Sequence, residues 1–125
     1  PQLPGVSDNI TVRSIVGRFL EHTRVYYFAN GHQNPNANGK RTYRLYCASA
    51  DWMERNLFSR VEVAFPIEDP IVFKRIMEDL HNYLKDNVNA WELDAKGTWR
   101  AITPGEGEAA FSAQDYLLNK ITRKS

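Results

Sequence analysis

The amino-acid sequence predicts a mixed α/β domain of the α+β kind, with a largely antiparallel sheet flanked by helices. Short β-branched and aromatic stretches are separated by turn residues, and other segments repeat their apolar residues at helical spacing. The expected order is helix, three strands, helix, two strands and helix. Because 125 residues are enough for one hydrophobic core, we expect residues 1–125 to form a single domain.

Helical spacing first occurs between Val12 and Leu20. Apolar residues stand there at positions i, i+3, i+4, i+7 and i+8, namely Val12, Ile15, Val16, Phe19 and Leu20. A hydroxyl of either Thr11 or Ser14 can cap the first turn. The pattern therefore predicts an amphipathic helix ahead of the first strand.

Three strand-like stretches follow. Val25–Phe28 is β-branched and aromatic, and the loop Asn30–Arg41, which contains Asn-Gly twice, joins it to the returning stretch Tyr43–Ser49. These features predict a hairpin. A third strand is predicted over Val61–Phe65, since Pro66 ends the apolar alternation there.

The longest predicted helix begins at Asp69-Pro70, because Asp is a favoured cap and Pro suits the first helical position. Trp91–Leu93 and Thr98–Ile102 flank a Lys-Gly turn and predict a small hairpin. Ser112 then precedes a last apolar repeat and is expected to cap a C-terminal helix. The apolar face of the longest helix is expected to contain Phe73, Ile76, Met77, Leu80, Tyr83 and Leu84.

Charge and hydropathy exclude several classes of protein. The net charge of +1 does not support a whole-surface attraction to nucleic acid or anionic lipid. No apolar stretch approaches the roughly 18–20 residues that a membrane-spanning helix needs. Cys47 is the only cysteine, so no disulfide can form within the chain. We expect a cytoplasmic protein in which Cys47 is a buried strand thiol.

Polar residues stand at the ends of predicted elements in two segments. His22 and Arg24 precede the strand Val25–Phe28, and Ser49 and Asp51 follow the returning strand. If these two strands pair as a hairpin, Arg24 lies opposite the Ser49 end. Both segments then meet at one edge of the sheet.

These residue types suit a phosphate. Arginine supplies charge and a bidentate fork, an imidazole can donate or accept a proton near neutral pH, and a hydroxyl and a carboxylate can orient them. Phosphoryl transfer depends mainly on such positioning and charge stabilisation. Two simpler interpretations stay open: His22 can be only a partner of a helix dipole, and Asp51–Asn56 can be a capped turn over a packed Trp52.

Two stretches resemble a known family. The first is Asn9–Phe28, which contains the sequence SIVGRFLEHTRVYYF. The second is Ser49–Asn56, with the sequence SADWMERN, which is followed by Arg60–Val63 and Phe65–Ile67. Both resemble the second catalytic domain, at the C-terminus, of bacterial polyphosphate kinase. That domain is similar to half of a phospholipase D active site, so the resemblance implies a phospholipase D-like half-domain. The hairpin and last helix resemble the family only in general character.

The resemblance implies a part of an ATP:polyphosphate phosphotransferase. Such an enzyme moves the terminal phosphate of ATP reversibly onto inorganic polyphosphate, releases ADP, uses Mg²⁺ and passes through a phosphohistidine. The phosphorylated histidine belongs to the preceding half, so this chain is expected to be inactive without the remaining domains of the polypeptide. The Mg²⁺ ligands are not expected in this chain, and the full enzyme is expected to be a homo-oligomer.

The resemblance also assigns roles to individual residues. His22 matches the family's second active-site histidine, which contacts the nucleotide phosphates and is thought to give acid/base support. We expect the guanidinium groups of Arg24, Arg55 and Arg60 to neutralise phosphate charge. Ser49 and Asp51 would position these groups.

Phospholipase D itself has the pattern His-x-Lys, four residues and Asp, then Gly-Ser-x-Asn. In this chain Arg24 replaces the Lys, Ala29 replaces the Asp, and Ala48–Asp51 replaces the last motif. Loss of the Asp argues against phosphodiester hydrolysis. Two alternatives stay open: a phospholipase D-like phosphodiesterase half-domain, and a non-catalytic polyanion-binding or assembly module.

Overall fold

A computed structural model describes residues 1–31 and 43–122. The chain divides into two compact units, of which the first contains residues 1–20 and the residues from 77 onward, and the second contains residues 21–76. Each unit has its own three-stranded antiparallel sheet. The expectation that residues 1–125 form a single domain stays a prediction.

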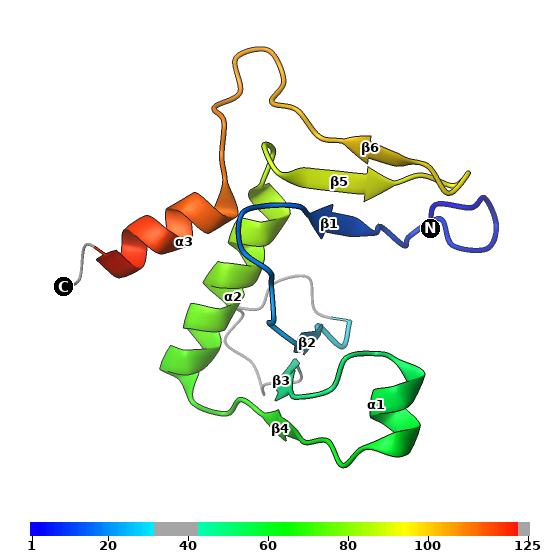
Figure 1. Ribbon diagram of the computed structural model, residues 1–125, viewed down its shortest axis with the longest axis vertical. Helices are drawn as coiled ribbons and strands as arrows, with labels where there is room; N and C mark the ends of the chain where they lie inside the picture. Colours follow the sequence, from blue (N-terminus) through cyan, green and yellow to red (C-terminus); the bar gives the residue numbers. More distant parts are fainter. Residues whose placement is uncertain (32–42, 123–125) are drawn as a thin grey trace. The chain divides into compact units, whose positions relative to one another are not determined.

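The first unit has a sheet in the order β1-β5-β6 (Figure 1). Its strands are β1 (Arg13–Ile15), β5 (Ala90–Leu93) and β6 (Trp99–Ala101). The predicted hairpin is confirmed, because Asp94 accepts the backbone N–H groups that close its turn and Trp91 pairs with Ala101. Helix α3 (Ala113–Thr122) begins after Ser112, whose hydroxyl accepts the N–H of Asp115 at 3.3 Å, so the predicted cap is also confirmed.

The helix predicted over Val12–Leu20 is wrong. This segment contains β1 instead, and the N–H of Val16 donates to the carbonyl of Asn89 at 2.9 Å. The N–H of Leu93 donates to the carbonyl of Val12 at 3.1 Å. Since Val12, Ile15 and Val16 are β-branched and suit a strand, ladder hydrogen bonds to β5 outweigh the helical spacing of the apolar residues.

The second unit has a sheet in the order β2-β3-β4, formed by β2 (Val25–Phe28), β3 (Arg44–Ala48) and β4 (Ala64–Pro66). The predicted pairing of the first two strands is confirmed, with Val25 opposite Cys47. Most of the predicted loop, residues 32–41, lies outside the described residues. β4 begins later than predicted and ends with Pro66, which an edge strand tolerates because no further strand needs its missing N–H.

Two helices are connected to the strands of this sheet along the sequence. The short helix α1 (Glu54–Ser59) lies between β3 and β4 and was not predicted. The predicted long helix is confirmed as α2 (Pro70–Lys85). The carboxylate of Asp69 accepts the N–H groups of Ile71 at 2.8 Å and Val72 at 2.9 Å, as a helix cap should.

The observed order of elements is three strands, a helix, a strand, a helix, two strands and a helix. Mixed α/β architecture with antiparallel sheets is thus confirmed, and the finer likeness to half of a phospholipase D site stays a prediction. Among the described residues, Leu45, Ala90 and Ala113 are almost fully buried, while Cys47 is half-buried. No helix in residues 1–31 and 43–122 is long and apolar enough to cross a bilayer.

Candidate functional site

The end of the β2–β3 hairpin brings two predicted site residues together. The carbonyl of Arg24 accepts the N–H of Ala48 at 3.0 Å, which extends the ladder by one step. At that step the Nε of Arg24 donates to Oδ1 of Asp51 at 2.8 Å. The predicted meeting of the two segments at one edge of the sheet is therefore confirmed for these two residues.

The guanidinium of Arg24 is held in a fixed orientation. Besides the bond to Asp51, its Nη1 donates to the backbone carbonyl of His22 at 2.9 Å. A guanidinium has five N–H donors, so donors remain that can bind the oxygens of an anion. Because the Arg24 side chain is about a quarter exposed, a ligand can reach these donors.

Arg24 and Asp51 stabilise each other's charged form. The hydrogen bond from Arg24 holds the pKa of Asp51 below its usual range, and the positive charges of Arg24, Arg55 and His22 act in the same direction. The bond from Asp51 raises the pKa of Arg24, and the carboxylate of Glu62 adds to that effect. We conclude that Arg24 and Asp51 are both ionised over the whole physiological pH range.

His22 lies in the exposed segment between β1 and β2. Its backbone carbonyl is held by Arg24, and its imidazole adds positive charge near Asp51 when protonated. The structure therefore brings His22, Arg24 and Asp51 to one place, with the imidazole open to solvent.

Ser49 is hydrogen-bonded to Glu62, which in turn is bonded to Asn56, and the sequence pattern predicted neither contact. Its hydroxyl donates to Oε2 of Glu62, and Oε1 of the same carboxylate accepts the side-chain amide of Asn56 at 3.0 Å. Ser49 Oγ also accepts the N–H of Val63 at 3.0 Å. The hydroxyl proton of Ser49 is thus used in the bond to Glu62. In this arrangement Ser49 fixes the backbone at Val63 and does not donate to a phosphate.

The sequence gives one indication that Glu62 has a hydrogen-bond partner. Glu62 interrupts the apolar alternation between Val61 and Val63, and a lone carboxylate in such a stretch commonly has a partner. Asn56 is only 4% exposed, yet its amide oxygen has no hydrogen-bond partner among the described residues. Only the fold reveals that the two side chains meet.

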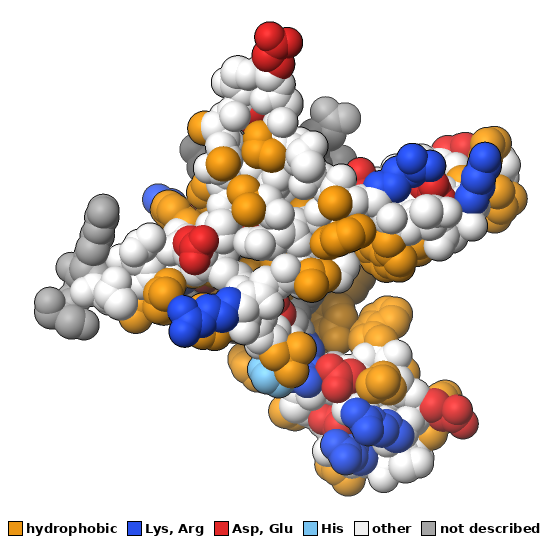
Figure 2. All heavy atoms as spheres, turned by 45° about the horizontal axis from the view of Figure 1, so that its top comes forward, with side chains coloured by type: hydrophobic (Ala, Val, Ile, Leu, Met, Phe, Trp, Pro, Cys, Tyr) orange, Lys and Arg blue, Asp and Glu red, His pale blue; other side chains and the backbone are white. Residues whose placement is uncertain are grey.

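The other two predicted arginines are exposed. Arg55 is in the first turn of α1 and lies near enough to Asp51 to lower its pKa, whereas Arg60 directly follows the helix. No hydrogen bond or ion pair joins Arg60 to the cluster in the described part of the chain. On the face in Figure 2, basic side chains lie beside acidic ones, with exposed hydrophobic side chains among them.

The described residues do not form a metal site. Within residues 1–31 and 43–122 there is no group of three or more His, Cys, Asp or Glu side chains that could hold an ion. The two carboxylates of the cluster, Asp51 and Glu62, already accept hydrogen bonds from Arg24, Ser49 and Asn56. Magnesium therefore does not fit the residues in these two described ranges as a resident ion.

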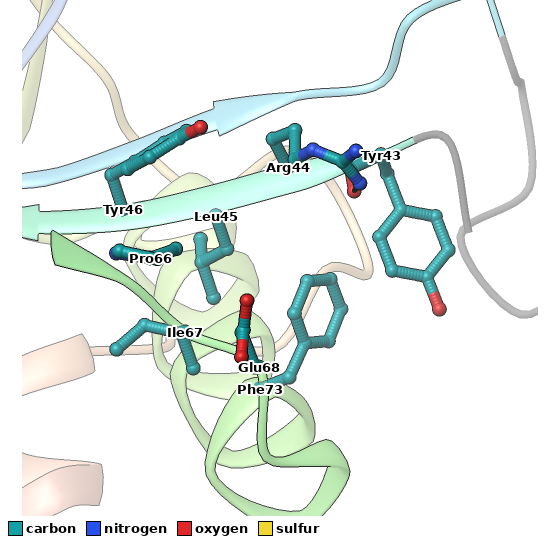
Figure 3. A pocket seen from close by; sticks show the side chains of 8 residues that line it. All are labelled: Tyr43, Arg44, Leu45, Tyr46, Pro66, Ile67, Glu68 and Phe73. Carbon is teal, nitrogen blue, oxygen red and sulfur yellow. Dashed lines mark hydrogen bonds between the residues drawn. The ribbon is translucent and has the colours of Figure 1, made fainter.

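A separate pocket of about 390 Å³ lies at the opposite end of β3 (Figure 3). Leu45 points from β3 towards the first turns of α2, and the ring of Phe73 points back towards β3. The rings of Tyr43 and Phe73 contact each other, with centroids 4.8 Å apart. The pocket contains none of the predicted site residues. Its wall is formed by Tyr43, Arg44, Leu45, Tyr46, Pro66, Ile67, Glu68 and Phe73.

Comparison with known proteins decides the family. Residues 1–114 match the family model described as polyphosphate kinase C-terminal domain 2. The chain belongs to this family. A polyphosphate kinase of Xylella fastidiosa (strain Temecula1) is 54% identical over 122 residues, which are 97% of this chain and 16% of the relative. The polyphosphate kinase of Pseudomonas aeruginosa (strain PAO1) is 46% identical over 121 residues, again 97% of this chain and 16% of the relative.

A solved structure agrees with the sequence comparison. The crystal structure of polyphosphate kinase from Porphyromonas gingivalis matches with a TM-score of 0.81 at 31% identity, and the match covers 99% of this chain and 17% of that chain. This polyphosphate kinase domain thus spans only about 16% of the length of the curated relatives it matches.

Proposed function

We propose that this domain is a working part of an ATP:polyphosphate phosphotransferase. In this proposal His22 faces the transferring phosphate, and the guanidinium groups of Arg24, Arg55 and Arg60 neutralise its charge. Asp51 orients Arg24, and Ser49 fixes the backbone at the end of β3. The chain works together with the remaining domains of a longer polypeptide and is inactive without them.

One observation carries the proposal most directly. In a polyphosphate kinase C-terminal domain, the Arg24 guanidinium is fixed by Asp51 at 2.8 Å and by the His22 carbonyl at 2.9 Å. An arginine oriented in this way is pre-organised for an anion, because its remaining N–H donors need no rearrangement when the anion binds. A polyphosphate chain or the ATP phosphates are anions of the right kind.

The proposed reaction has two transfers. In the first, the bond between the γ-phosphorus of ATP and its bridging oxygen breaks, a P–N bond forms to a histidine outside this chain, and ADP leaves. In the second, that P–N bond breaks and a terminal oxygen of polyphosphate forms the new P–O bond. The imidazole of His22 supports charge or a proton on the leaving oxygen, and the arginines bind the non-bridging oxygens.

Other properties of the whole enzyme belong to the same proposal. Mg²⁺ would enter with the nucleotide or be held outside this chain, since the residues described here do not fit it. We further propose a cytoplasmic homo-oligomer, free or peripheral to the inner membrane.

The test compares two reactions in the full-length enzyme that contains this chain. Wild type and His22→Ala are incubated with γ-labelled ATP and polyphosphate, and in parallel with an activated phosphodiester. We expect label in polyphosphate for wild type, a large loss for His22→Ala and no phosphodiester hydrolysis by either. Hydrolysis that depends on His22 would favour a phosphodiesterase. Polyphosphate binding with no dependence of turnover on His22 would favour a binding module.

A further inference from the structure

Ser49 and Val63 close a loop within the second unit. The N–H of Ser49 donates to the carbonyl of Val63 at 2.9 Å, and Ser49 Oγ accepts the N–H of Val63 at 3.0 Å. This pairing continues the antiparallel ladder between β3 and β4 by one step. Residues 50–62 therefore connect the two strands as a closed loop, and this loop contains two residues of the proposed site, Asp51 and Arg55.

Glu62 is the last residue of this loop, and its carboxylate binds two side chains. Oε2 accepts a hydrogen bond from the hydroxyl of Ser49, and Oε1 accepts one from the side-chain amide of Asn56 at 3.0 Å. Ser49 belongs to the closed end of the loop, and Asn56 belongs to α1. The carboxylate therefore connects that closed end to the helix, and every residue of this connection lies in the second unit.

The side chains of α1 are buried and exposed in an unusual pattern. Its buried residue is the polar Asn56, which is 4% exposed, whereas Leu57 and Phe58 are 55% and 83% exposed. Apolar burial among the described residues therefore contributes little to holding α1 in place. The bond from the Asn56 amide to Glu62 matters more, because its donor belongs to a buried side chain and its acceptor is a carboxylate.

Arg55 lies between two fixed points of the loop. On one side, the carboxylate of Asp51 is bonded to Arg24. On the other side, Asn56 is bonded to Glu62. The guanidinium of Arg55 also lies near enough to Asp51 to lower the pKa of that carboxyl group. A change at either fixed point therefore alters where Arg55 directs its charge.

Building on the proposed function, we propose that Glu62 is a positioning residue that acts through Asn56 on Arg55. Its carboxylate fixes α1, so that the guanidinium of Arg55 joins that of Arg24 at the non-bridging oxygens of the phosphate. Glu62 does not contact the phosphate, which its negative charge would repel. Each of the two arginines is thus oriented by a carboxylate of its own: Asp51 orients Arg24, and Glu62 orients Arg55.

The experiment measures single-turnover transfer from γ-labelled ATP in the full-length enzyme that contains this chain. Glu62→Ala and Asn56→Ala break the same contact from its two sides. We expect each to slow transfer about tenfold, the scale of one lost hydrogen bond to a charged group, and the double variant to be no slower than Glu62→Ala. Glu54→Gln is the matched control and should transfer at the wild-type rate, because Glu54 is an exposed carboxylate of the same helix.

Glu62→Gln separates the position of this side chain from its charge. The introduced amide can accept the Asn56 bond through its oxygen and donate to Ser49 Oγ through its nitrogen, so the loop keeps both connections without the negative charge. We therefore expect Glu62→Gln to transfer at close to the wild-type rate. Slowing equal to that of Glu62→Ala would show that the charge matters and would overturn the positioning role.

Coupling to Arg55 separates positioning from general stability. If Glu62 acts through Arg55, adding Glu62→Ala to Arg55→Ala causes no further slowing, whereas a change that only loosens the fold slows both backgrounds equally. Circular dichroism checks that each variant is folded. If Glu62→Ala does not fold, Asn56→Ala takes its place in the same comparison, because it removes a buried amide whose oxygen has no hydrogen-bond partner among the described residues.

Each failure has a distinct result. Normal transfer by either Glu62→Ala or Asn56→Ala, or equal slowing in the wild-type and Arg55→Ala backgrounds, would overturn the role of Glu62 and leave the proposed role of His22 standing. Normal transfer by His22→Ala would overturn the proposed function, and the inference about Glu62 with it.

Discussion

Arg24 and Asp51, 27 positions apart in the sequence, are joined by a 2.8 Å hydrogen bond at the end of the β2–β3 hairpin. The bond exists because the ladder places Arg24 opposite Ala48, from which the chain turns to bring Asp51 back to the guanidinium. This bond gives the Arg24 guanidinium one orientation, which the proposed phosphate site requires.

The first prediction separates the charge of Arg24 from its geometry. In the full-length enzyme, Arg24→Lys keeps the charge but cannot keep both the Asp51 and His22 bonds, so kcat/KM should fall about tenfold or more. Arg24→Ala should fall further. Steady-state kinetics with ATP and polyphosphate measure both, and Arg18→Lys is the matched control because Arg18 is exposed and outside the cluster. Wild-type kinetics for Arg24→Lys would show that only charge matters.

The second prediction concerns how the stability that the Arg24–Asp51 pair contributes depends on pH. The hydrogen bond from Arg24 lowers the pKa of folded Asp51 below its unfolded value of about 3.9. The pair therefore stabilises the fold fully above that unfolded pKa, and this contribution is lost as the pH falls through the lower, folded pKa. Chemical unfolding of the 125-residue chain from acid to neutral pH should show wild type more stable than Asp51→Asn at neutral pH, with the gap closing only in strong acid. A gap that closes well above the unfolded pKa would contradict this assignment.

The third prediction tests the contact between Asn56 and Glu62. Asn56→Asp places two carboxylates side by side and should lower the free energy of unfolding by about 2 kcal/mol. Adding Glu62→Gln exchanges the amide and the carboxylate and recreates the same hydrogen bonds, including the one from Ser49. The double variant should return to within about 0.5 kcal/mol of wild type. Additive losses in denaturant titrations would mean that the two residues act separately.

The fourth prediction concerns Asp86, which is fully buried in the first unit. Its carboxylate accepts the backbone N–H groups of Val88 at 3.0 Å, Asn89 at 2.7 Å and Ala113 at 2.8 Å. Asp86→Ala leaves these donors without a partner and should destabilise the chain by about 3 kcal/mol or more. Asp115→Asn, exposed at the start of α3, should cost less than about 1 kcal/mol. Equal losses in thermal unfolding would refute the special role of Asp86.

Local chemistry made much of the fold predictable. Asp69-Pro70 and Ser112 are strong helix starts, and the strands Val25–Phe28 and Trp91–Leu93 have β-branched or aromatic residues between turns. The meeting of Arg24 and Asp51 followed from hairpin pairing alone. These features depend on residues that lie close together in the sequence, so the local pattern is enough to predict them.

Features that depend on distant partners were not predictable. Val12–Leu20 has helical spacing, but β5 provides a ladder for it more than 70 residues later in the chain. The contacts of Glu62 are another example, because its carboxylate accepts hydrogen bonds from Ser49 and Asn56, which lie 13 and 6 residues earlier in the chain. Gln114 has no unusual feature in the sequence, but its side-chain oxygen accepts the backbone N–H of Phe19, which lies 95 positions earlier.

The most direct test of the central claim is the single-turnover rate at which full-length enzyme with His22→Ala removes the γ-phosphate from saturating labelled ATP. We expect this rate to collapse while the variant remains folded by circular dichroism, because in the proposed site the imidazole faces the phosphate that is transferred. A rate equal to that of wild type would contradict the proposed role of His22 and would exclude this residue from the phosphoryl-transfer site.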